Sequence, residues 1–331
     1  MRVLVTGAGG FIGHHLVKRL KAEGHWVRGA DIKEPEFEPS AADEFLVGDL
    51  RFFEPCAQAT RGVDDVYQLA ADMGGIGYIT ANHAGLTRNN TLINVHMLEA
   101  ARVTSVKRYL YTSSACVYPS FLQHNADLTP LKEADAIPAD PEKGYGWEKL
   151  FTEQLVTYYH EDFGLDVRIV RFHNIYGPLG TWDGGKEKAP AAIMRKISAA
   201  KDGDVIEVWG DGQQTRSFCH VDDCVEGLLR LMKSGYTKPL NLGRDEMVSV
   251  DELVDTVAAV SGKRIVKRHD LTKPQGVRGR NSDNRLLREI LKWEPAIDLK
   301  TGLARTYPWI WEQLNQRGGA QKPAPQPVLT R

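Results

Sequence analysis

Short apolar runs alternate with amphipathic segments over the first half of the chain. Residues 2–6 are apolar, a glycine-rich turn and a segment with helical spacing follow, and a second apolar run ends at Asp31. Further apolar runs lie at residues 44–50, 63–71, 107–118 and 166–177, and further segments with helical spacing lie at 89–106 and 145–164. Buried parallel strands appear in a sequence as apolar runs, and the helices that connect them appear as amphipathic segments. The alternation of the two therefore predicts an α/β fold with a doubly wound parallel sheet.

From residue 173 the pattern loosens into glycine-rich loops and shorter elements. Helices are expected from Pro190 to about residue 201, after Asp222, and after Ser249, where Glu252 would complete a capping box. These elements predict a smaller α/β C-terminal lobe that binds the substrate. The predicted division is a nucleotide-binding domain of residues 1–172 with 213–236 returning to it, a substrate lobe of residues 173–212 and 237–317, and a proline-rich tail of residues 318–331.

Composition narrows the classes of function. The chain has 331 residues, of which 42% are hydrophobic and 26% are charged, and its formal net charge is -1, which gives no general attraction for nucleic acids or anionic membranes. No apolar segment reaches the roughly 20 residues that a membrane helix needs, and a strand follows Met1 directly, so we expect neither membrane partner nor signal peptide. The 4 cysteines lack metal-type spacing, which favours reduced thiols, no metal site and a cytoplasmic location.

The glycine-rich turn predicts a dinucleotide site on a Rossmann-type fold. Gly7, Gly10 and Gly13 lie between a strand and a helix, where the backbone can approach a pyrophosphate at the helix N-terminus. Asp31 ends the next strand, where a carboxylate accepts hydrogen bonds from ribose hydroxyls and repels a 2′-phosphate, which favours NAD over NADP. The expected cofactor contacts are Gly7, Gly10, Phe11, Ile12, Gly13, Asp31, Asp49, Leu50, Leu69, Tyr145 and Lys149.

Tyr145 and Lys149 lie four residues apart on one face of a predicted helix. An ammonium and a cationic nicotinamide beside a phenol should lower the pKa of Tyr145, so that the phenolate takes a hydroxyl proton while hydride leaves for the cofactor. Ser114, near the end of a predicted strand, would hydrogen-bond the same substrate oxygen. The three residues predict redox chemistry on an alcohol.

Several longer sequence segments resemble those of the extended short-chain dehydrogenase/reductase family, the NAD-dependent epimerases and dehydratases of nucleotide sugars. These segments are LAADMGGIGYI (69–79), SSACVYP (113–119), RFHNIYGPLGTWDGGKEKAPAA (171–192), WGDGQQTRSF (209–218), DEMVSVDEL (245–253) and GVRGRNSDN (276–284). The resemblance spans residues 1 to about 315 and is strongest to the members that invert carbons 3 and 5 of GDP-mannose to give GDP-L-galactose. It implies tightly held NAD, a nucleotide-sugar substrate and a homodimer.

Residue by residue, the resemblance implies Ser114, Tyr145 and Lys149 for the redox steps, with Cys116 and Lys188 as the pair that exchanges protons. The implied substrate contacts are Met73, Gly74, Ser114, Asn174, Glu187, Lys188, Lys196, Gln214, Arg216 and Arg280. The charge of Lys196, Arg216 and Arg280 also suits a diphosphate, although exposed cations often have no specific role.

The chemistry of such a reaction requires a base and an acid on opposite faces of the sugar. Oxidation at carbon 4 makes the protons on carbons 3 and 5 removable, because both carbons are then α to a carbonyl. Cys116 follows Ser114 by two residues, and its thiolate is expected to be favoured beside Lys149 and the nicotinamide. Lys188 precedes Pro190, a first-turn proline, so the helix dipole should lower the pKa of Lys188.

Three alternatives remain open from the residues themselves. A nucleotide-sugar 4-epimerase needs redox chemistry only, so Cys116 and Lys188 would be idle. A 4,6-dehydratase needs acidic groups after the strand-end serines, where this chain has Ala115 and Cys116. A non-catalytic NAD-binding regulator needs the glycine turn but not the phenol of Tyr145. On base rates Cys116 would be a packing residue and Lys188 a solvated lysine.

Overall fold

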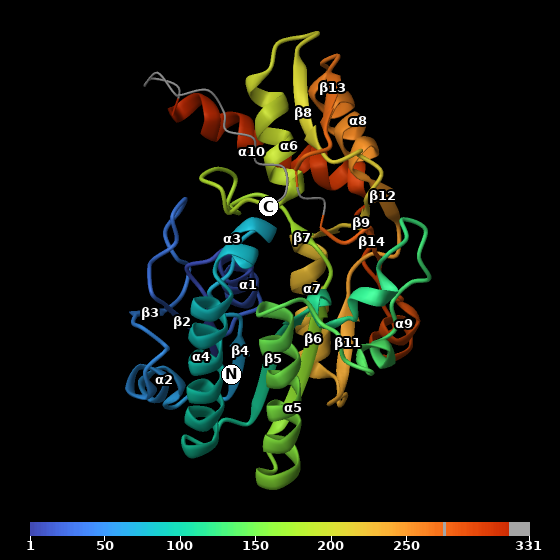
Figure 1. Cartoon of the computed structure of the whole chain (residues 1–331). Coiled ribbons are helices and arrows are strands. Elements are labelled where there is room, and N and C mark those ends of the chain that lie inside the picture. Colours follow the sequence, from blue (N-terminus) through green and yellow to red (C-terminus); the bar gives the residue numbers. More distant parts are fainter. Residues whose placement is uncertain (274–275, 318–331) are drawn as a thin grey trace.

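A parallel sheet forms the centre of the computed structural model, which describes residues 1–273 and 276–317 (Figure 1). In these ranges the sheet has 7 strands in the order β11-β6-β5-β4-β1-β2-β3. Each neighbouring pair is parallel. The strands are β1 (Arg2–Thr6), β2 (Trp26–Asp31), β3 (Glu44–Val47), β4 (Asp65–Gln68), β5 (Arg108–Ser114), β6 (Asp166–Phe172) and β11 (Pro239–Leu242). The order 3-2-1-4-5-6 confirms the predicted Rossmann-type fold.

Helices cover both faces of this sheet. One face packs on α1 (Phe11–Ala22), α7 (Val221–Lys233) and α9 (Arg285–Leu291), and the other on α2 (Phe53–Thr60), α4 (His83–Val103) and α5 (Tyr145–Phe163). Successive residues of a strand point to opposite faces. In β1, accordingly, Val3 and Val5 enter one core while Leu4 enters the other.

A second apolar cluster lies above the carboxyl edge of the sheet, at the top of Figure 1. It combines α6 (Ala189–Ala199), α8 (Val250–Ser261) and α10 (Leu299–Arg317) with the parallel pair β8 (Val205–Trp209) and β13 (Val266–Asp270). Short strands connect it to the main sheet: β7 (Ile175–Tyr176), β9 (Thr215–Ser217), β10 (Cys219–His220), β12 (Met247–Ser249) and β14 (Gly279–Arg280). The predicted capping box is present, because Ser249 Oγ accepts from Glu252 N at 3.1 Å and Glu252 Oε2 from Ser249 N at 2.7 Å.

Three sequence predictions need correction. The helix expected after Asp222 begins at Val221, and His220 is its cap, because the His220 ring accepts from Asp222 N. The apolar run 107–118 is not one strand, since β5 ends at Ser114 and one turn of 3-10 helix follows. The run 166–177 is broken between β6 and β7, where Asn174 has a φ of 45°.

The predicted division into domains stays a prediction, with one change. Strand β11 lies within the segment 237–317 that was assigned to the substrate lobe, but it pairs with β6 at the edge of the main sheet. The predicted tail, residues 318–331, lies outside the described residues. Among the helices of the described residues, none has the length and apolar character needed to cross a membrane.

A buried ion pair fixes α5 to the sheet. The Arg171 guanidinium on β6 donates from Nε and Nη2 to the two carboxylate oxygens of Glu153 at 2.9 and 2.7 Å. The side chains of Arg171 and Glu153 are only 4% and 1% exposed. The Ser113 hydroxyl on β5 also donates to Glu153. This two-sided attachment holds the first turn of α5, which begins at Tyr145, over the carboxyl ends of the strands.

Replacing Glu153 with Leu should lower the free energy of unfolding by about 3–5 kcal/mol, because Arg171 then keeps a buried, unpaired charge. Urea unfolding followed by circular dichroism measures this change. The double variant Glu153→Leu, Arg171→Met removes both charges and should regain most of the loss. Equal stability of Glu153→Leu and the parent would contradict a structural role of the pair.

Candidate active site

The carboxyl ends of the central strands open into a cavity of about 1310 Å³. Its floor includes the residues that end or follow β1, β2, β4, β5 and β6, namely Gly7, Asp31, Leu69, Ser114 and Phe172. The opposite wall comes from α6 and from the short strands β9 and β14. Ligands of open α/β sheets bind at this edge, where strand order reverses between β1 and β4.

The glycine turn leaves the N-terminus of α1 open to the cavity. Gly7 has a φ of +67°, and a side chain on Gly13 would place its Cβ 2.1 Å from Gly7 O. The N-cap, Gly10, provides no side-chain hydrogen bond, so the first-turn N–H groups lack a side-chain acceptor. Such a turn binds a pyrophosphate by its backbone donors and the helix dipole.

Carboxylates lie at the end of the cavity next to this turn. Asp31 accepts hydrogen bonds from Gly9 N at 3.0 Å and Lys33 N at 3.3 Å, and burial raises its pKa. Asp49 is paired with Arg51 at 2.6 Å, and the hydrogen bond from Arg51 lowers the pKa of Asp49. The open helix end and the Asp31 carboxylate fit the pyrophosphate and the adenosine ribose of NAD. Every predicted cofactor residue lines the cavity: Gly7, Gly10, Phe11, Ile12, Gly13, Asp31, Asp49, Leu50, Leu69, Tyr145 and Lys149.

Tyr145 and Lys149 face the cavity from the first turns of α5. Lys149 Nζ donates to Thr112 O at 3.1 Å and lies 5.6 Å from the centre of the Tyr145 ring. Among the protein groups, burial raises the pKa of Tyr145 well above its usual value, Cys116 and Glu148 add to the rise, and Ser114 opposes it, so the predicted lowering by the nicotinamide charge stays a prediction. Burial likewise lowers the pKa of Lys149. Positive charge from a bound ligand would therefore be needed to ionise the phenol.

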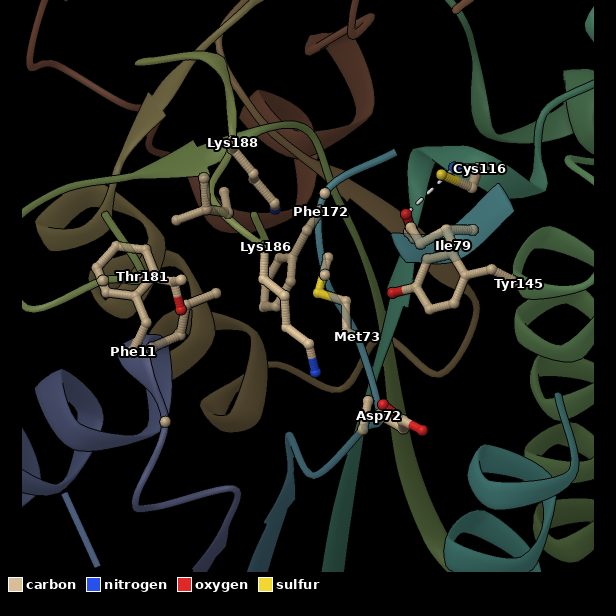
Figure 2. A pocket seen from close by; sticks show the side chains of 18 of the residues that line it. Phe11, Asp72, Met73, Ile79, Cys116, Tyr145, Phe172, Thr181, Lys186 and Lys188 are labelled. Atoms are coloured by element: carbon tan, nitrogen blue, oxygen red, sulfur yellow. Dashed lines mark hydrogen bonds between the residues drawn. The ribbon is translucent and has the colours of Figure 1, made fainter. Parts of the chain in front are cut away.

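Cys116 is buried in a small apolar cluster with Ile79, Leu86 and Tyr145, and it also lines the cavity. It lies on the 3-10 turn Ala115–Val117 that follows β5, and its N–H donates to Ser114 Oγ at 3.2 Å (dashed in Figure 2). Arg280 Nη1 donates to Cys116 Sγ at 3.3 Å. Among the protein groups, burial and then the charge of Glu142 raise the pKa of Cys116 to about 11, although Arg280 opposes them, and the predicted effect of the nicotinamide charge on the thiolate stays a prediction. The cation in hydrogen-bond contact with the thiol is Arg280, whereas the sequence suggested Lys149.

Lys188 enters the cavity from another side. It is the N-cap residue of α6, and Pro190 lies in the first turn as predicted. The expected fall in the pKa of Lys188 is found, but burial is the largest cause and the helix dipole is not needed to explain it. Figure 2 shows Lys188 and Cys116 approaching the same space from separate walls, with Phe172 and Met73 drawn between them. An acid and a base in this arrangement can act on opposite faces of one ligand.

Most of the implied substrate contacts also reach the cavity. Those that line it are Met73, Gly74, Ser114, Asn174, Glu187, Lys188, Gln214, Arg216 and Arg280. Lys196 does not line it, because its side chain leaves α6 toward β8, where Nζ donates to Glu207 O at 2.8 Å. Glu187 lines the cavity, but its carboxylate accepts from Arg195 Nη2 at 2.9 Å and Gly185 N at 2.7 Å. Glu187 thus holds the loop that carries Lys188.

Sequence reasoning missed a bridge between two walls of the cavity. The Lys186 ammonium lies 3.8 Å from the centre of the Tyr78 ring on α3 (Ile76–Ala81), and Gly75 N donates to Lys186 O at 3.0 Å. The Tyr78 hydroxyl donates to Asp72 Oδ1 at 2.8 Å. Figure 2 shows Lys186, Met73 and Asp72 beside the open space. No local pattern predicts this bridge, because its partners are about 100 residues apart.

Glu142 was also missed. It lines the cavity three residues before Tyr145, and its backbone N donates to Cys116 O at 3.0 Å. The available signal was an acidic residue in the loop that leads into the helix of Tyr145. Loop residues set on a rigid scaffold often carry function.

Comparisons with known proteins agree with this geometry. The sequence model of the NAD dependent epimerase/dehydratase family matches residues 3–243. The chain is 52% identical to GDP-mannose 3,5-epimerase of Arabidopsis thaliana over 96% of the chain and 84% of that protein, and 51% identical to GDP-mannose 3,5-epimerase 1 of Oryza sativa subsp. japonica over 96% and 83%.

Solved structures share the fold. MoeE5 in complex with UDP-glucuronic acid and NAD has a TM-score of 0.81 and 30% identity, covering 95% of this chain and 100% of that one. UDP-glucose 4-epimerase of Thermotoga maritima with UDP-glucose has a TM-score of 0.84 over 95% and 100% of the two chains; its 24% identity shows likeness of fold alone.

Replacing Arg280 with Gln removes the cation that holds down the pKa of Cys116, so this pKa should rise further above about 11. The pH dependence of Cys116 alkylation by iodoacetamide, followed by peptide mass spectrometry, measures the change. Its midpoint should move to higher pH in Arg280→Gln, whereas Arg278→Gln, whose Nη1 binds Asp211 at 2.7 Å, should leave it in place. A midpoint unchanged in Arg280→Gln would contradict the assignment of Arg280 to the thiol.

Proposed function

The chain belongs to the NAD-dependent epimerase/dehydratase family, and we propose that it inverts carbons 3 and 5 of GDP-mannose to give GDP-L-galactose. The observation that carries the proposal is the placing of Cys116 and Lys188 on separate walls of the cavity that also contains Tyr145. Relatives at 52% and 51% identity named for this reaction support it. A 4-epimerase would not use Cys116 and Lys188.

Residues at the edge of the sheet would hold the cofactor. The N-terminus of α1 would bind the pyrophosphate, and Asp31 would accept hydrogen bonds from the adenosine ribose. NAD held by these residues would supply reversible hydride transfer at carbon 4 of the sugar. The wall that carries Ser114 and Tyr145 would hold the reacting carbon and keep water away from it.

Tyr145 would take the proton of the hydroxyl on carbon 4 and later return it. Ser114 would orient the same oxygen by a hydrogen bond, since both residues line one part of the cavity. Lys149 is held by Thr112 O, so its ammonium stays beneath the phenol and stabilises the phenolate. These three groups would convert the alcohol to a ketone and back.

Cys116 and Lys188 would then exchange the protons on carbons 3 and 5. A thiolate whose conjugate thiol has a pKa of about 11 is scarce at neutral pH but is a strong base once formed. Burial lowers the pKa of Lys188, so its ammonium gives up a proton more readily. A carbon that loses its proton to Cys116 and regains one from Lys188 is inverted.

Arg216 would contact the diphosphate of the substrate. Its guanidinium lines the cavity and donates to Thr215 O and Val277 O, both at 2.7 Å. Burial, followed by the charge of Arg280, lowers the pKa of Arg216 to about 9. Two guanidinium groups this close in one buried wall favour an anionic ligand between them.

The NAD-loaded protein, incubated with GDP-mannose in deuterated water, should form GDP-L-galactose labelled at carbons 3 and 5. Cys116→Ser should bind NAD normally and lose at least about 100-fold in the rate of labelling, because serine is a far weaker base in this position. Cys56→Ser, at a cysteine that contacts Leu50 O away from the thiol site, is the matched control. Unlabelled product inverted at carbon 4 would instead support a 4-epimerase.

A homodimer is proposed through α4 and α5, which lie side by side in Figure 1. Trp147, Phe151 and Tyr158 on α5 are 51%, 51% and 53% exposed, and their spacing places them on one side of the helix. Leu92 and Val103 on α4 are also exposed. Exposed apolar side chains gathered on neighbouring helices are typical of an interface between subunits.

Phe151→Glu should convert the dimer to a monomer, because the charge would have to be buried between subunits. Molar mass from light scattering after size exclusion measures this change. Phe121→Glu, at a residue that is 47% exposed on a different segment, should leave the mass unchanged. A dimer that survives Phe151→Glu at the same concentration would refute this interface.

A further inference from the structure

Glu142 has an unusual environment for a carboxylate. Its Oε1 is buried and accepts no hydrogen bond from an N–H or O–H group of the described residues. Its Oε2 lies 3.9 Å from Arg280 Nη2, and its side chain is 18% exposed. An unpaired oxygen of this kind is costly, so its position calls for a functional explanation.

The neighbour that Glu142 affects is the thiol of Cys116. The Glu142 backbone donates to Cys116 O at 3.0 Å, which places the two side chains on the same wall. After burial, the charge of Glu142 is the largest influence on the pKa of Cys116, and it raises this pKa. The titratable and charged groups that interact with Cys116 are Glu142, Tyr145, Lys149, Lys188, Arg216 and Arg280.

The proposed reaction creates a need for such a partner. In the chair form of mannose the hydrogens on carbons 3 and 5 are axial and point to the same ring face. A base on that face must therefore remove both. After the first removal Cys116 carries a proton as a thiol, while Lys188 has given up a proton. A second inversion requires that Cys116 lose its proton and that Lys188 regain one while the sugar stays bound.

We propose that Glu142 accepts the thiol proton of Cys116 and passes it to water, a step that rests on the proposed function. This transfer restores the thiolate between the two inversions. The proton moves from Sγ to Oε1, the thiolate remains beside Arg280, and the carboxyl then releases the proton to solvent through its exposed part. Water returns one proton to Lys188. No electrons are transferred in these steps, and charge is conserved.

Lys188 approaches the ligand from the opposite wall, and the remaining neighbours of Cys116 are unsuited to this transfer. Arg280 and Arg216 are guanidinium cations and accept no proton, and Lys149 has its ammonium bound to Thr112 O. Tyr145 serves the oxygen on carbon 4. Glu148 on α5 also has a buried Oε2 without a hydrogen-bond partner, but its Oε1 accepts from Asn94 Nδ2 and Thr152 Oγ1, and it is not among the groups that shift the pKa of Cys116. Glu142 alone among the described carboxylates acts on the thiol.

The test compares products of the NAD-loaded protein and of Glu142→Gln after brief incubation with GDP-mannose in deuterated water. Glutamine keeps the shape but cannot take the proton, so sugar inverted at a single carbon should still form while doubly inverted sugar falls by about 100-fold. Asp140→Asn is the matched control, because Asp140 lies in the same loop but accepts from the Ser120 hydroxyl, outside the cavity lining. Its product ratio should equal that of the parent.

Alkylation of Cys116 in the substrate-free protein gives an independent readout. Removing the carboxylate charge should move the midpoint pH of alkylation downward in Glu142→Gln, opposite to the shift expected for Arg280→Gln. A purely structural role of Glu142 would not produce this shift. An unshifted midpoint, or an equal loss of singly and doubly inverted sugar, would overturn the proposal. Absence of label with the parent protein would refute the proposed function instead, whatever the alkylation result.

Discussion

Parallel strands end at a common edge, and this constraint brings the whole site together. β1, β2, β4, β5 and β6 come from segments up to about 170 residues apart, yet their carboxyl ends all line the same cavity. The constraint works only if the helices that return from that edge are held in place. The buried contact between Glu153 and Arg171 does this for α5, and so fixes the phenol at its first turn relative to Ser114.

Burial then determines the electrostatics of the site. Removal from water disfavours every charged form, which raises the pKa of Cys116 and of Tyr145 and lowers that of Lys188. Burial therefore works against the charged form of each of these three side chains, and groups that bind beside them can offset its effect. Arg280 and Glu142 act in opposite directions on the same sulfur, so small changes at either one adjust when the thiolate forms.

Features that depend on local spacing could be predicted from the sequence, and features that depend on burial could not. The apolar pattern reveals the boundaries of strands and helices. These boundaries identify the glycine turn, Asp31, and Tyr145 with Lys149 as candidate site residues. The rise in the pKa of Cys116 comes first from burial and then from the charge of Glu142, against the effect of Arg280, and the fold sets all three. The sequence likewise could not show that Lys196 is directed away from the cavity. Its ammonium donates a hydrogen bond to Glu207 O, and this contact depends on the position of β8.

The bridge of Lys186 to Tyr78 and Gly75 has a consequence for fidelity. An exposed cation–π contact is worth roughly 0.5–1 kcal/mol, so this contact and the hydrogen bond from Gly75 N form only a weak link between the two walls. Separation of the two walls would allow the ketone intermediate of the proposed reaction to dissociate before it is reduced. In the proposed reaction, the strength of this contact would therefore affect how much of the ketone leaves the protein before the hydride returns.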